Sequence, residues 1–236
     1  MYALILAGGK GERLRPLTDD LPKPMVSVCG RPMLEHQVEW LQAGGVTDVI
    51  FLAGYRWESI ESYFGDGRNF GINVQYSVED SPLGRGGAIK KGCPLLPASE
   101  HTVVVLNGDV ITEETLDAVV ASYQERKSKD QSHLATLLAV PMVSPYGLLE
   151  IDSDEAVTGF REKVEMPHWI NGGVYVFDRA IFPEFPDLGD HEVETFPRLA
   201  DAGKIAAFRT RSFWCSVDSF KDLREAEDYL SRAKTA

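Results

Sequence analysis

Short apolar runs alternate with amphipathic segments along the first half of the chain. Residues 2–7, 49–52 and 103–106 are wholly apolar. Continuous apolar runs of this length are typical of strands that are buried on both faces of a parallel sheet. The segments between them repeat apolar residues at three- and four-residue steps, which is the period of an amphipathic helix. We therefore predict strands at residues 2–7, 46–53, 72–78 and 103–106, and helices at 33–43, at 57–64, from 84 onward and at about 112–126.

The pattern changes after residue 127. The polar segment 127–132 predicts a surface loop. It is followed by a strand at 133–140, a hairpin from 146–152 and 156–164, a strand at 169–177, a helix at about 192–202, a strand at 205–208 and a last helix behind a Ser219-x-x-Asp222 cap. From these elements we predict an α/β fold with a Rossmann-like, doubly wound mixed sheet that is mostly parallel and flanked by helices. We expect a single domain over 1–236, with lobes at about 1–127 and 128–236.

The first apolar run leads directly into a glycine-rich loop, Gly8-Gly9-Lys10-Gly11-Glu12-Arg13, and Pro22-Lys23-Pro24 follows soon after. Glycines at the carboxyl end of a strand offer bare backbone N–H groups to phosphate oxygens, and Arg13 and Lys23 add positive charge nearby. The spacing is neither the G-x-G-x-x-G of dinucleotide-binding loops nor the G-x-x-x-x-G-K-[ST] of P-loops. We interpret the loop as a nucleoside-triphosphate site of another kind.

Composition and charge narrow the classes of protein. The chain of 236 residues has a formal net charge of −12, which argues against a general nucleic-acid binder because DNA and RNA backbones require basic surface. Its three cysteines show no CxxC spacing, so the sequence predicts neither a disulfide framework nor a zinc site and favours a reducing compartment. The first apolar run is too short for a signal peptide, and no run approaches the length of a membrane span. We expect a cytoplasmic protein that binds neither nucleic acid nor membranes.

An acidic residue follows the fourth predicted strand in the sequence Asn107-Gly108-Asp109. The carboxyl ends of parallel strands share one edge of a sheet, so Asp109 faces the same crevice as the glycine loop. A carboxylate at this position suits Mg²⁺, which binds through one or two carboxylates together with phosphate oxygens. The alternative is a turn or helix N-cap aspartate.

The run from Ala7 to Thr18, with its pattern A-G-G-x-G-x-R-L-x-P-L-T, resembles the opening of the sugar-1-phosphate nucleotidyltransferases, and so does Pro22-Lys23-Pro24. The resemblance continues through most of the chain. It implies the nucleotidyltransferase fold, which is similar to that of GT-A glycosyltransferases, and implies that Asp109 binds the catalytic metal ion. The first lobe then binds the nucleotide and the second lobe, which includes the C-terminal helix, binds the sugar phosphate.

The second metal ligand of the family is an aspartate in a W-x-D-V-G-T-like segment. The matching run here is Trp214-Cys215-Ser216-Val217-Asp218, with Ser216 at the usual aspartate position and Asp218 where glycine is typical. Because alternate residues of a strand point to the same side, Asp218 is a candidate for this metal ligand. The alternative is an acidic residue at the start of the last helix.

Three segments resemble the sugar-binding side of the family. Tyr146-Gly147 is similar to its Y-G motif, Phe160-Arg161-Glu162-Lys163 to F-x-E-K, and Asn171-Gly172-Gly173 to N-x-G. The resemblance implies that Lys163 contacts the sugar phosphate and that the sugar is contacted by Gly147, Glu162, Asn171 and Gly172. Taken singly, Glu162-Lys163 also fits an exposed pair and Asn171-Gly172 also fits a bulge.

The run Leu83-Gly84-Arg85-Gly86-Gly87-Ala88 resembles the L-G-T-G-G-A segment that lines the nucleobase pocket of the family, with Arg85 in the threonine position. The role of Arg85 stays open between a nucleotide contact and a cover for the rim. The expected nucleotide-binding residues are Leu6, Ala7, Gly8, Gly9, Gly11, Glu79, Gly84, Gly86 and Gly87.

These parts predict an enzyme that joins an NTP to a sugar 1-phosphate and releases pyrophosphate, with Mg²⁺ as cofactor and with Arg13, Lys23 and Asp109 as catalytic residues. Pro22-Lys23-Pro24 and the short spacing from E-K to N-x-G resemble the mannose-1-phosphate and heptose-phosphate guanylyltransferases, so GTP and mannose 1-phosphate are the expected substrates. The alternatives are UTP- or dTTP-dependent transfer to glucose 1-phosphate or an amino-sugar phosphate, guanylyl transfer to a cyclitol phosphate, a catalytically silent sugar-nucleotide-binding regulator, which Ser216 fits, and a glycosyltransferase. The sequence leaves assembly into a homo-oligomer open.

Overall fold

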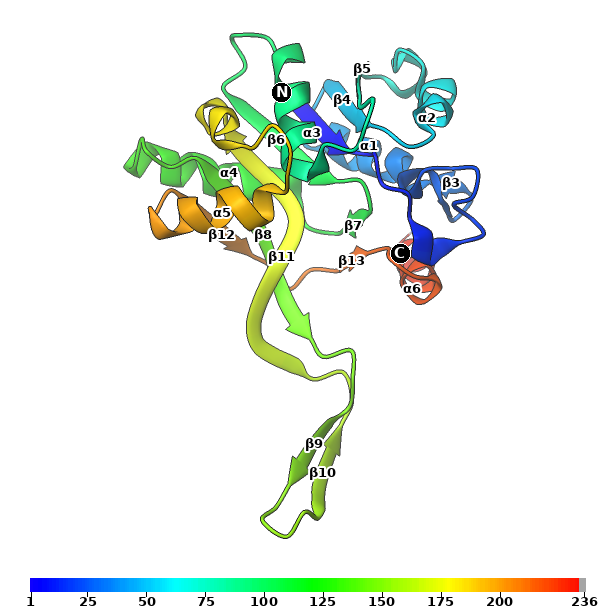
Figure 1. Ribbon diagram of the computed structural model, residues 1–236, viewed down its shortest axis with the longest axis vertical. Coiled ribbons are helices and arrows are strands. Elements are labelled where there is room, and N and C mark those ends of the chain that lie inside the picture. The colour runs from blue at the N-terminus through cyan, green and yellow to red at the C-terminus, as the bar shows by residue number, and fades with distance from the viewer. Residues whose placement is uncertain (234–236) are drawn as a thin grey trace.

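The computed structural model describes residues 1–233 and is built around one seven-stranded sheet (Figure 1). The strand order is β12-β8-β11-β6-β1-β4-β5. The bounds are Tyr2–Leu6 for β1, Asp48–Ala53 for β4, Asn73–Val78 for β5, Thr102–Asn107 for β6, Ala135–Val143 for β8, Glu165–Asp178 for β11 and Ile205–Arg209 for β12. Only β11 runs antiparallel to its neighbours in this sheet. The predicted mixed, mostly parallel sheet is therefore confirmed, and it contains strands from both predicted lobes.

Helices cover both faces of the sheet, because the central strands present apolar side chains on both sides. Ala3 and Ile5 of β1 join a core on one face, and Leu4 joins a core on the other. The first core is completed by α1 (Met33–Ala43), α2 (Trp57–Phe64) and α4 (Leu116–Lys129). The second core is completed by α3 (Gly84–Gly92) and α5 (His191–Asp201). This arrangement is the doubly wound fold that the alternating pattern predicts.

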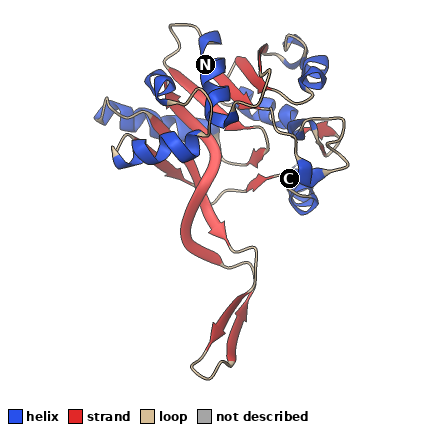
Figure 2. Cartoon of the chain, viewed as in Figure 1, coloured by secondary structure: helices blue, strands red, loops and turns tan. Residues whose placement is uncertain are grey.

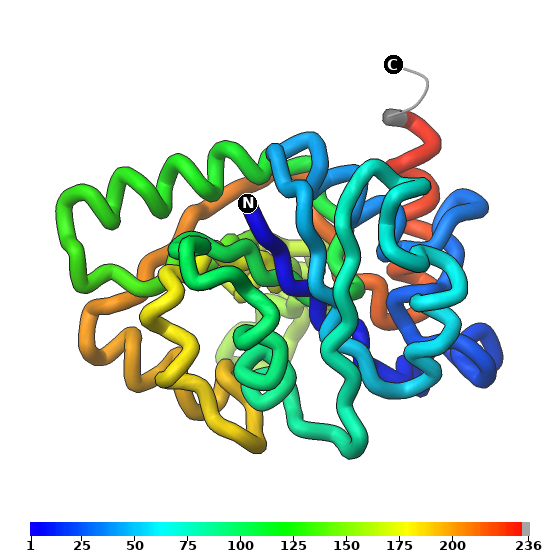
Figure 3. The backbone as a smooth tube through the Cα atoms, turned by 90° about the horizontal axis from the view of Figure 1, so that it is seen from above, coloured from blue at the N-terminus to red at the C-terminus, as the bar shows by residue number. Residues whose placement is uncertain are grey.

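A third, smaller core brings the end of the chain to its beginning. It joins Leu14 and Val28 to Cys215, Val217 and Leu223. The elements involved are the short helices η1 (Glu12–Leu14) and η2 (Lys23–Met25), the strand pair β2 (Ser27–Val28) and β3 (Arg31–Pro32), the strand pair β7 (Val110–Thr112) and β13 (Trp214–Ser216), and α6 (Phe220–Ala233). Seen from above, the red α6 lies beside the blue segments that follow β1 (Figure 3).

The predicted hairpin is present as β9 (Leu148–Ile151) and β10 (Val157–Arg161), and it stands away from the body of the molecule (Figure 2). The other short helices are η3 (Arg68–Phe70), η4 (Cys93–Leu95) and η5 (Arg179–Glu184). Within residues 1–233, no helix combines the length and the apolar character that crossing a bilayer requires. Residues 234–236 of the predicted domain lie outside the described residues.

The surface loop predicted at 127–132 is wrong in its first half, because α4 continues to Lys129. Lys127 forms an ion pair with Asp178 at 2.6 Å and donates to the carbonyl of His133 at 2.9 Å, and Lys129 pairs with Glu125 one helical turn earlier. The contacts of Lys127 hold the polar end of the helix against the end of β11 and the segment that precedes β8, whereas the local sequence shows only a run of polar residues.

Candidate active site

The carboxyl ends of β1, β4 and β6 open into one pocket of about 310 Å³. The glycine loop enters it from β1, and the turn that follows β6 enters it from the side. The lining residues include Gly8, Gly9, Lys23, Glu79, Gly84, Arg85 and Asp109. The structure thus gathers in one cavity most of the residues that the sequence predicts for nucleotide binding and catalysis.

The glycine loop is folded onto the backbone around Lys23. Gly11 has a φ of +63°, and a Cβ atom there would lie 2.8 Å from the Cβ of Lys23, so only glycine fits without strain. The amide of Lys23 donates to the carbonyl of Gly9 at 3.0 Å. A Cβ at Gly9, by contrast, would meet no atom within 4 Å. The loop is therefore tight on its inner side and open on the side where phosphate groups would lie.

The Nζ atom of Lys23 lies between two carboxylates. It forms ion pairs with Asp109 and, at 2.6 Å, with Asp218, while Arg13 pairs with the same Oδ1 of Asp218 at 2.6 Å. The Lys23 side chain is only 11% exposed, whereas that of Arg13 is 73% exposed. Four charged residues from three distant segments therefore meet in one cluster, of which Lys23 and Asp109 line the pocket.

The turn that carries Asp109 is fixed by its neighbours. A Cβ at Gly108 would lie 2.5 Å from the carbonyl oxygen of Leu6, which explains the glycine in this motif. The amide of Gly108 donates to that carbonyl at 3.0 Å, and the carbonyl of Asp109 accepts from the amide of Val217 at 2.9 Å. Asp109 is thereby held between β1 and the segment that follows β13.

The cluster fits a divalent cation that takes most of its ligands from substrate and water. Oδ1 of Asp109 is buried and has no hydrogen-bond partner within residues 1–233, and Asp218 is the carboxylate across Lys23. No group of three or more His, Cys, Asp or Glu residues in the described part of the chain is arranged to hold a metal ion. Two carboxylates completed by phosphate oxygens and water are the usual surroundings of Mg²⁺.

The geometry removes the helix-cap alternative for Asp218. Ser219 caps α6 instead, since its Oγ accepts from the amide of Asp222 at 3.4 Å and donates to the carboxylate of Asp222 at 2.8 Å. The side chain of Asp218 turns toward Lys23 and accepts a long hydrogen bond from Ser216 Oγ at 3.4 Å. Its role as a metal ligand stays a prediction.

The predicted base-binding residues divide into two groups. Glu79 and Gly84 line the pocket, and burial raises the pKa of the Glu79 carboxyl. Gly86 and Gly87 are not among the lining residues. A Cβ on Gly86 would lie 2.9 Å from the amide of His191, and one on Gly87 would lie 2.6 Å from the carbonyl of Asp187. The second pair of glycines therefore allows α3 to pack closely against the loop before α5.

Arg85 is held by two acidic residues that sequence reasoning missed. Its guanidinium donates to Asp190 Oδ2 at 2.5 and 2.8 Å and to Glu192 Oε1 at 2.6 Å. The hydroxyl of Tyr175 donates to the same Glu192 oxygen at 3.0 Å, and Asn171 donates to Tyr175 at 2.8 Å. A chain of hydrogen bonds thus links the base side of the pocket to the strand predicted to contact the sugar. The sequence feature that could have indicated these partners of Arg85 is the pair of acidic residues, Asp190 and Glu192, at the start of α5.

The predicted sugar-phosphate residues lie outside the pocket that Glu79 and Gly84 line. Glu162 and Lys163 line a neighbouring pocket of about 590 Å³ together with Trp214 and Ser216. Lys163 has a φ of +52°, an unfavourable backbone conformation for a lysine and one that is concentrated at functional sites. Gly147 lies beside Glu162, since a Cβ there would meet Glu162 Oε1 at 3.0 Å.

Asn171 and Gly172 lie elsewhere on β11, at a break in its register with β8, so this segment is a bulge. Trp214 Nε1 donates to the carbonyl of Gly172 at 2.7 Å and ties the bulge to β13. Neither Asn171 nor Gly172 lines the pocket of about 590 Å³ that contains Glu162 and Lys163. Their contact with a sugar stays a prediction.

Comparison with known proteins places this geometry in context. The family described as nucleotidyl transferase matches residues 2–232. The mannose-1-phosphate guanylyltransferase of Mycobacterium tuberculosis is 34% identical over 236 residues, which covers 97% of this chain and 62% of that protein. The chain thus spans about 62% of the length of the curated relatives that it matches.

The similarity extends to solved structures of HddC from Yersinia pseudotuberculosis. One has a TM-score of 0.74 and 29% identity, and a second, complexed with GMP-PN, has a TM-score of 0.72 and 28% identity. Each covers 97% of this chain and 99% of that chain.

Proposed function

We propose, because this chain belongs to the nucleotidyl transferase family, that it transfers a guanylyl group from GTP to mannose 1-phosphate or a related sugar 1-phosphate. The observation that carries this proposal is the position of Lys23, between Asp109 and Asp218 and beside the open face of the glycine loop. A site of this kind combines cation-binding carboxylates, fixed positive charge and bare backbone N–H groups, which are the groups that bind a triphosphate.

The sugar phosphate is already an anionic nucleophile, so no side chain has to activate it. One of its oxygens attacks the α-phosphorus, a new P–O bond forms, the bond to the β-phosphate breaks and pyrophosphate leaves. We assign the amides of Gly9–Gly11 and Arg13 to the β- and γ-phosphates, Lys23 to the α-phosphate and Lys163 to the sugar phosphate. Their contribution is to neutralise the repulsion between two anions and to hold them in line, which is the main component of catalysis in phosphoryl chemistry.

Nucleotidyl transferases of this family generally use a divalent metal ion. We assign Mg²⁺ to this role, with Asp109 and Asp218 as its protein ligands. When bound, the ion supplies positive charge that neutralises the phosphate oxygens. Asp218 then takes the part that the family gives to an aspartate at the position of Ser216.

The base side of the pocket supports GTP as the nucleotide. Guanine presents two adjacent N–H donor groups on its Watson–Crick edge, whereas uracil and thymine present one. The carboxylate of Glu79 is a double acceptor in the lining of the pocket, and one of its oxygens, Oε2, already accepts from the amide of Leu83 at 3.1 Å. An ionised carboxylate only accepts hydrogen bonds, so Glu79 matches the two N–H donor groups of guanine better than the single one of uracil or thymine.

Pyrophosphate release with Mg²⁺ tests the proposal. GTP, UTP, dTTP, CTP and ATP are each combined with mannose 1-phosphate and with glucose 1-phosphate. We expect release with GTP and mannose 1-phosphate. Release with UTP or dTTP and glucose 1-phosphate instead would reject the guanylyl assignment. Binding of GTP without release in any pair would point to a different sugar phosphate or to a catalytically silent binding protein. We also propose a cytoplasmic location, which the free thiols of Cys29, Cys93 and Cys215 support.

A further inference from the structure

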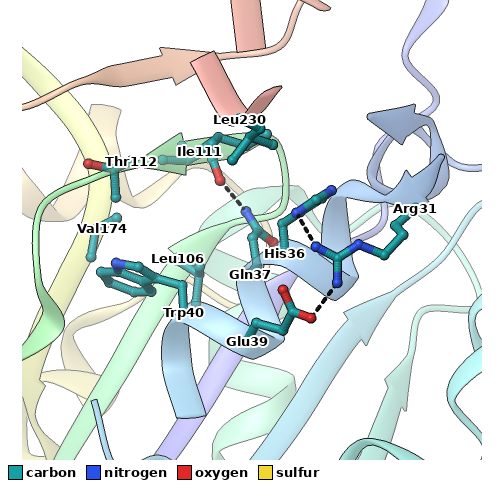
Figure 4. A pocket seen from close by; sticks show the side chains of 11 residues that line it. Arg31, His36, Gln37, Glu39, Trp40, Leu106, Ile111, Thr112, Val174 and Leu230 are labelled. Carbon is teal, nitrogen blue, oxygen red and sulfur yellow. Dashed lines mark hydrogen bonds and ion pairs between the residues drawn. The ribbon is translucent and has the colours of Figure 1, made fainter. Parts of the chain in front are cut away.

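A buried glutamine on α1 is bonded to the turn that carries Asp109. Gln37 is 3% exposed, and its Nε2 donates to the carbonyl of Asn107 and to the carbonyl of Val110, both at 2.8 Å. These two carbonyls stand on either side of Gly108-Asp109. Figure 4 shows Gln37 reaching from its helix toward the strand that carries Ile111. We propose that Gln37 is a positioning residue that holds the Asp109 carboxylate where it meets the metal ion and the triphosphate.

The bonding of the amide separates this role from simple packing. Both N–H groups of Gln37 are used, while its Oε1 is buried and has no hydrogen-bond partner in the described part of the chain. A buried acceptor without a partner lowers stability. Methionine has nearly the same shape and would leave no such oxygen, so packing alone favours methionine at this position. Compared with methionine, glutamine adds the two N–H groups that bond to the carbonyls of Asn107 and Val110.

Two other hydrogen bonds hold the same turn, from the amide of Gly108 to Leu6 and from the amide of Val217 to Asp109. They fix the backbone of residues 108 and 109 themselves. Gln37 instead joins the end of β6 to the start of β7, and so sets the width of the turn. Loss of Gln37 leaves the other two bonds in place, and we therefore expect a displaced carboxylate in a folded protein.

The surroundings of Gln37 leave room for a substitution. Gln37 lines a cavity of about 370 Å³ together with Trp40, Leu106 and Leu230 (Figure 4). A methionine side chain can therefore adjust into this space without pushing on β6. Gln37→Met removes both donors at little cost in packing, and Gln37→Glu removes them while keeping the shape and adding a negative charge near two carbonyl oxygens.

A second glutamine on the same helix provides the matched control. Gln42 is partly buried on α1, and its Nε2 donates to the carbonyl of Phe70 at 2.7 Å. It bonds to backbone as Gln37 does, but to a segment that is remote in sequence from the Asp109 turn. Gln42→Met therefore shows how much stability is lost when α1 loses a side-chain hydrogen bond that does not involve the Asp109 turn.

This inference rests on the proposed function, so one of its measurements does not require turnover. The first is the Mg²⁺ dependence of pyrophosphate release by wild type, Gln37→Met, Gln37→Glu and Gln42→Met. The second is Mn²⁺ binding in the presence of GTP, followed by the electron paramagnetic resonance signal of free Mn²⁺. The third is the melting temperature of each protein.

We expect Gln37→Met to lower kcat and to weaken Mn²⁺ binding by about 10- to 100-fold each, since residues that orient metal ligands commonly contribute this much, while Gln42→Met matches wild type in both. Gln37→Glu should be at least as impaired. Wild-type kcat and Mn²⁺ affinity in Gln37→Met would overturn the inference, and so would equal losses in Gln37→Met and Gln42→Met that follow their melting temperatures. If wild type releases no pyrophosphate from GTP with either sugar phosphate, the assignment of these substrates fails, and Mn²⁺ binding alone then decides the role of Gln37.

Discussion

Lys23 and Asp218 are separated by 195 positions in the sequence, and their charged groups lie 2.6 Å apart. The same ammonium group also pairs with Asp109. One partly buried cation thus compensates two carboxylates that would otherwise repel each other at close range. We therefore expect both the proposed chemistry of the site and its stability to depend on this triad.

Replacing the bridging lysine should remove most of the activity. We expect Lys23→Met to lower kcat by about 10²- to 10³-fold, because removal of one preorganised group that stabilises transition-state charge commonly has that effect. Steady-state pyrophosphate release measures it. Lys129→Met, which removes an exposed lysine at the end of α4, is the control, and a wild-type rate in Lys23→Met would reject its assigned role.

The same variant should respond more strongly to a metal ion. Without Lys23 the carboxylates of Asp109 and Asp218 face each other uncompensated, so we expect Lys23→Met to melt at a lower temperature than wild type. Adding Mg²⁺ should then raise the melting temperature of Lys23→Met more than that of wild type, since a ligand that binds only the native state stabilises it. Equal shifts in the two proteins would show that these carboxylates do not form the cation site.

The carboxylate of Asp218 can be moved to position 216, where the family has its aspartate. We expect Asp218→Asn to lower kcat by about 100-fold, and the double variant Ser216→Asp with Asp218→Asn to recover a part of that loss, because both side chains belong to the segment that faces Lys23. The readouts are kcat and the Mg²⁺ concentration at half-maximal rate. An Asp218→Asn enzyme with an unchanged Mg²⁺ dependence would remove Asp218 from the metal site.

Base selection should depend on Glu79. Glu79→Gln keeps the shape of the side chain but replaces one acceptor oxygen by a donor, so we expect kcat/KM for GTP to fall by about 10- to 100-fold while that for UTP changes little, in line with the effect of an unpaired polar group in a binding site. Asp80→Asn, a neighbouring exposed carboxylate, is the control. Parallel losses for GTP and UTP would indicate that Glu79 supports the pocket without choosing the base.

Substitution of Gly9 should weaken nucleotide binding without loss of stability, whereas substitution of Gly108 should lower stability. A Cβ at Gly9 meets no atom within 4 Å, so Gly9→Ala should melt like wild type yet bind GTP more weakly, because the methyl group enters the phosphate side of the loop. A Cβ at Gly108 would lie 2.5 Å from the carbonyl of Leu6, so Gly108→Ala should lose about 1–3 kcal/mol of stability, as overpacked sites do. Urea unfolding and nucleotide titration check the pair. Equal GTP affinity in wild type and Gly9→Ala would contradict the loop assignment.

A buried histidine should make the protein sensitive to mild acid. His191 has no exposed surface, neither ring nitrogen has a hydrogen-bond partner within residues 1–233, and burial lowers its pKa from 6.5 to about 4. The unfolded chain therefore takes up a proton below pH 6.5 while the folded protein does not, so stability falls as the pH decreases from 6.5 to about 4. The loss is about 1.4 kcal/mol for each pH unit.

His191→Phe removes this contribution and suits the surroundings, since the imidazole already makes edge contacts with Tyr175, Phe185 and Phe196. The free energy of unfolding in urea, measured between pH 7 and pH 4.5 for both proteins, gives the comparison. We expect a shallower decline in His191→Phe. Identical slopes would show that His191 titrates in the folded protein as it does in the unfolded chain.

The sequence alone identified the long helices, the strands of the central sheet and the glycine loop, because these are recorded locally, but it missed the short strands β2, β3 and β7. An apolar run such as residues 2–7 or a period of three to four residues follows from the geometry of one element. The same local logic identified Lys23 and Asp109 as candidates, because residues at the carboxyl ends of parallel strands share one edge. It failed at Lys127–Lys129, where the contacts of Lys127 with Asp178 of β11 and with the carbonyl of His133 hold a helix that extends into a polar segment.

Partners that lie far apart in the chain were decided only by the tertiary structure. Whether Asp218 caps a helix or faces Lys23 depends on how α6 packs beside η1 and β13, and the same holds for the acidic partners of Arg85 and for the hydrogen bonds from Gln37. A side chain's residue type sets what it can bind, but its neighbours are set by the packing of whole elements against one another. That information is distributed over all the apolar faces of the chain, and no short stretch of the sequence contains it.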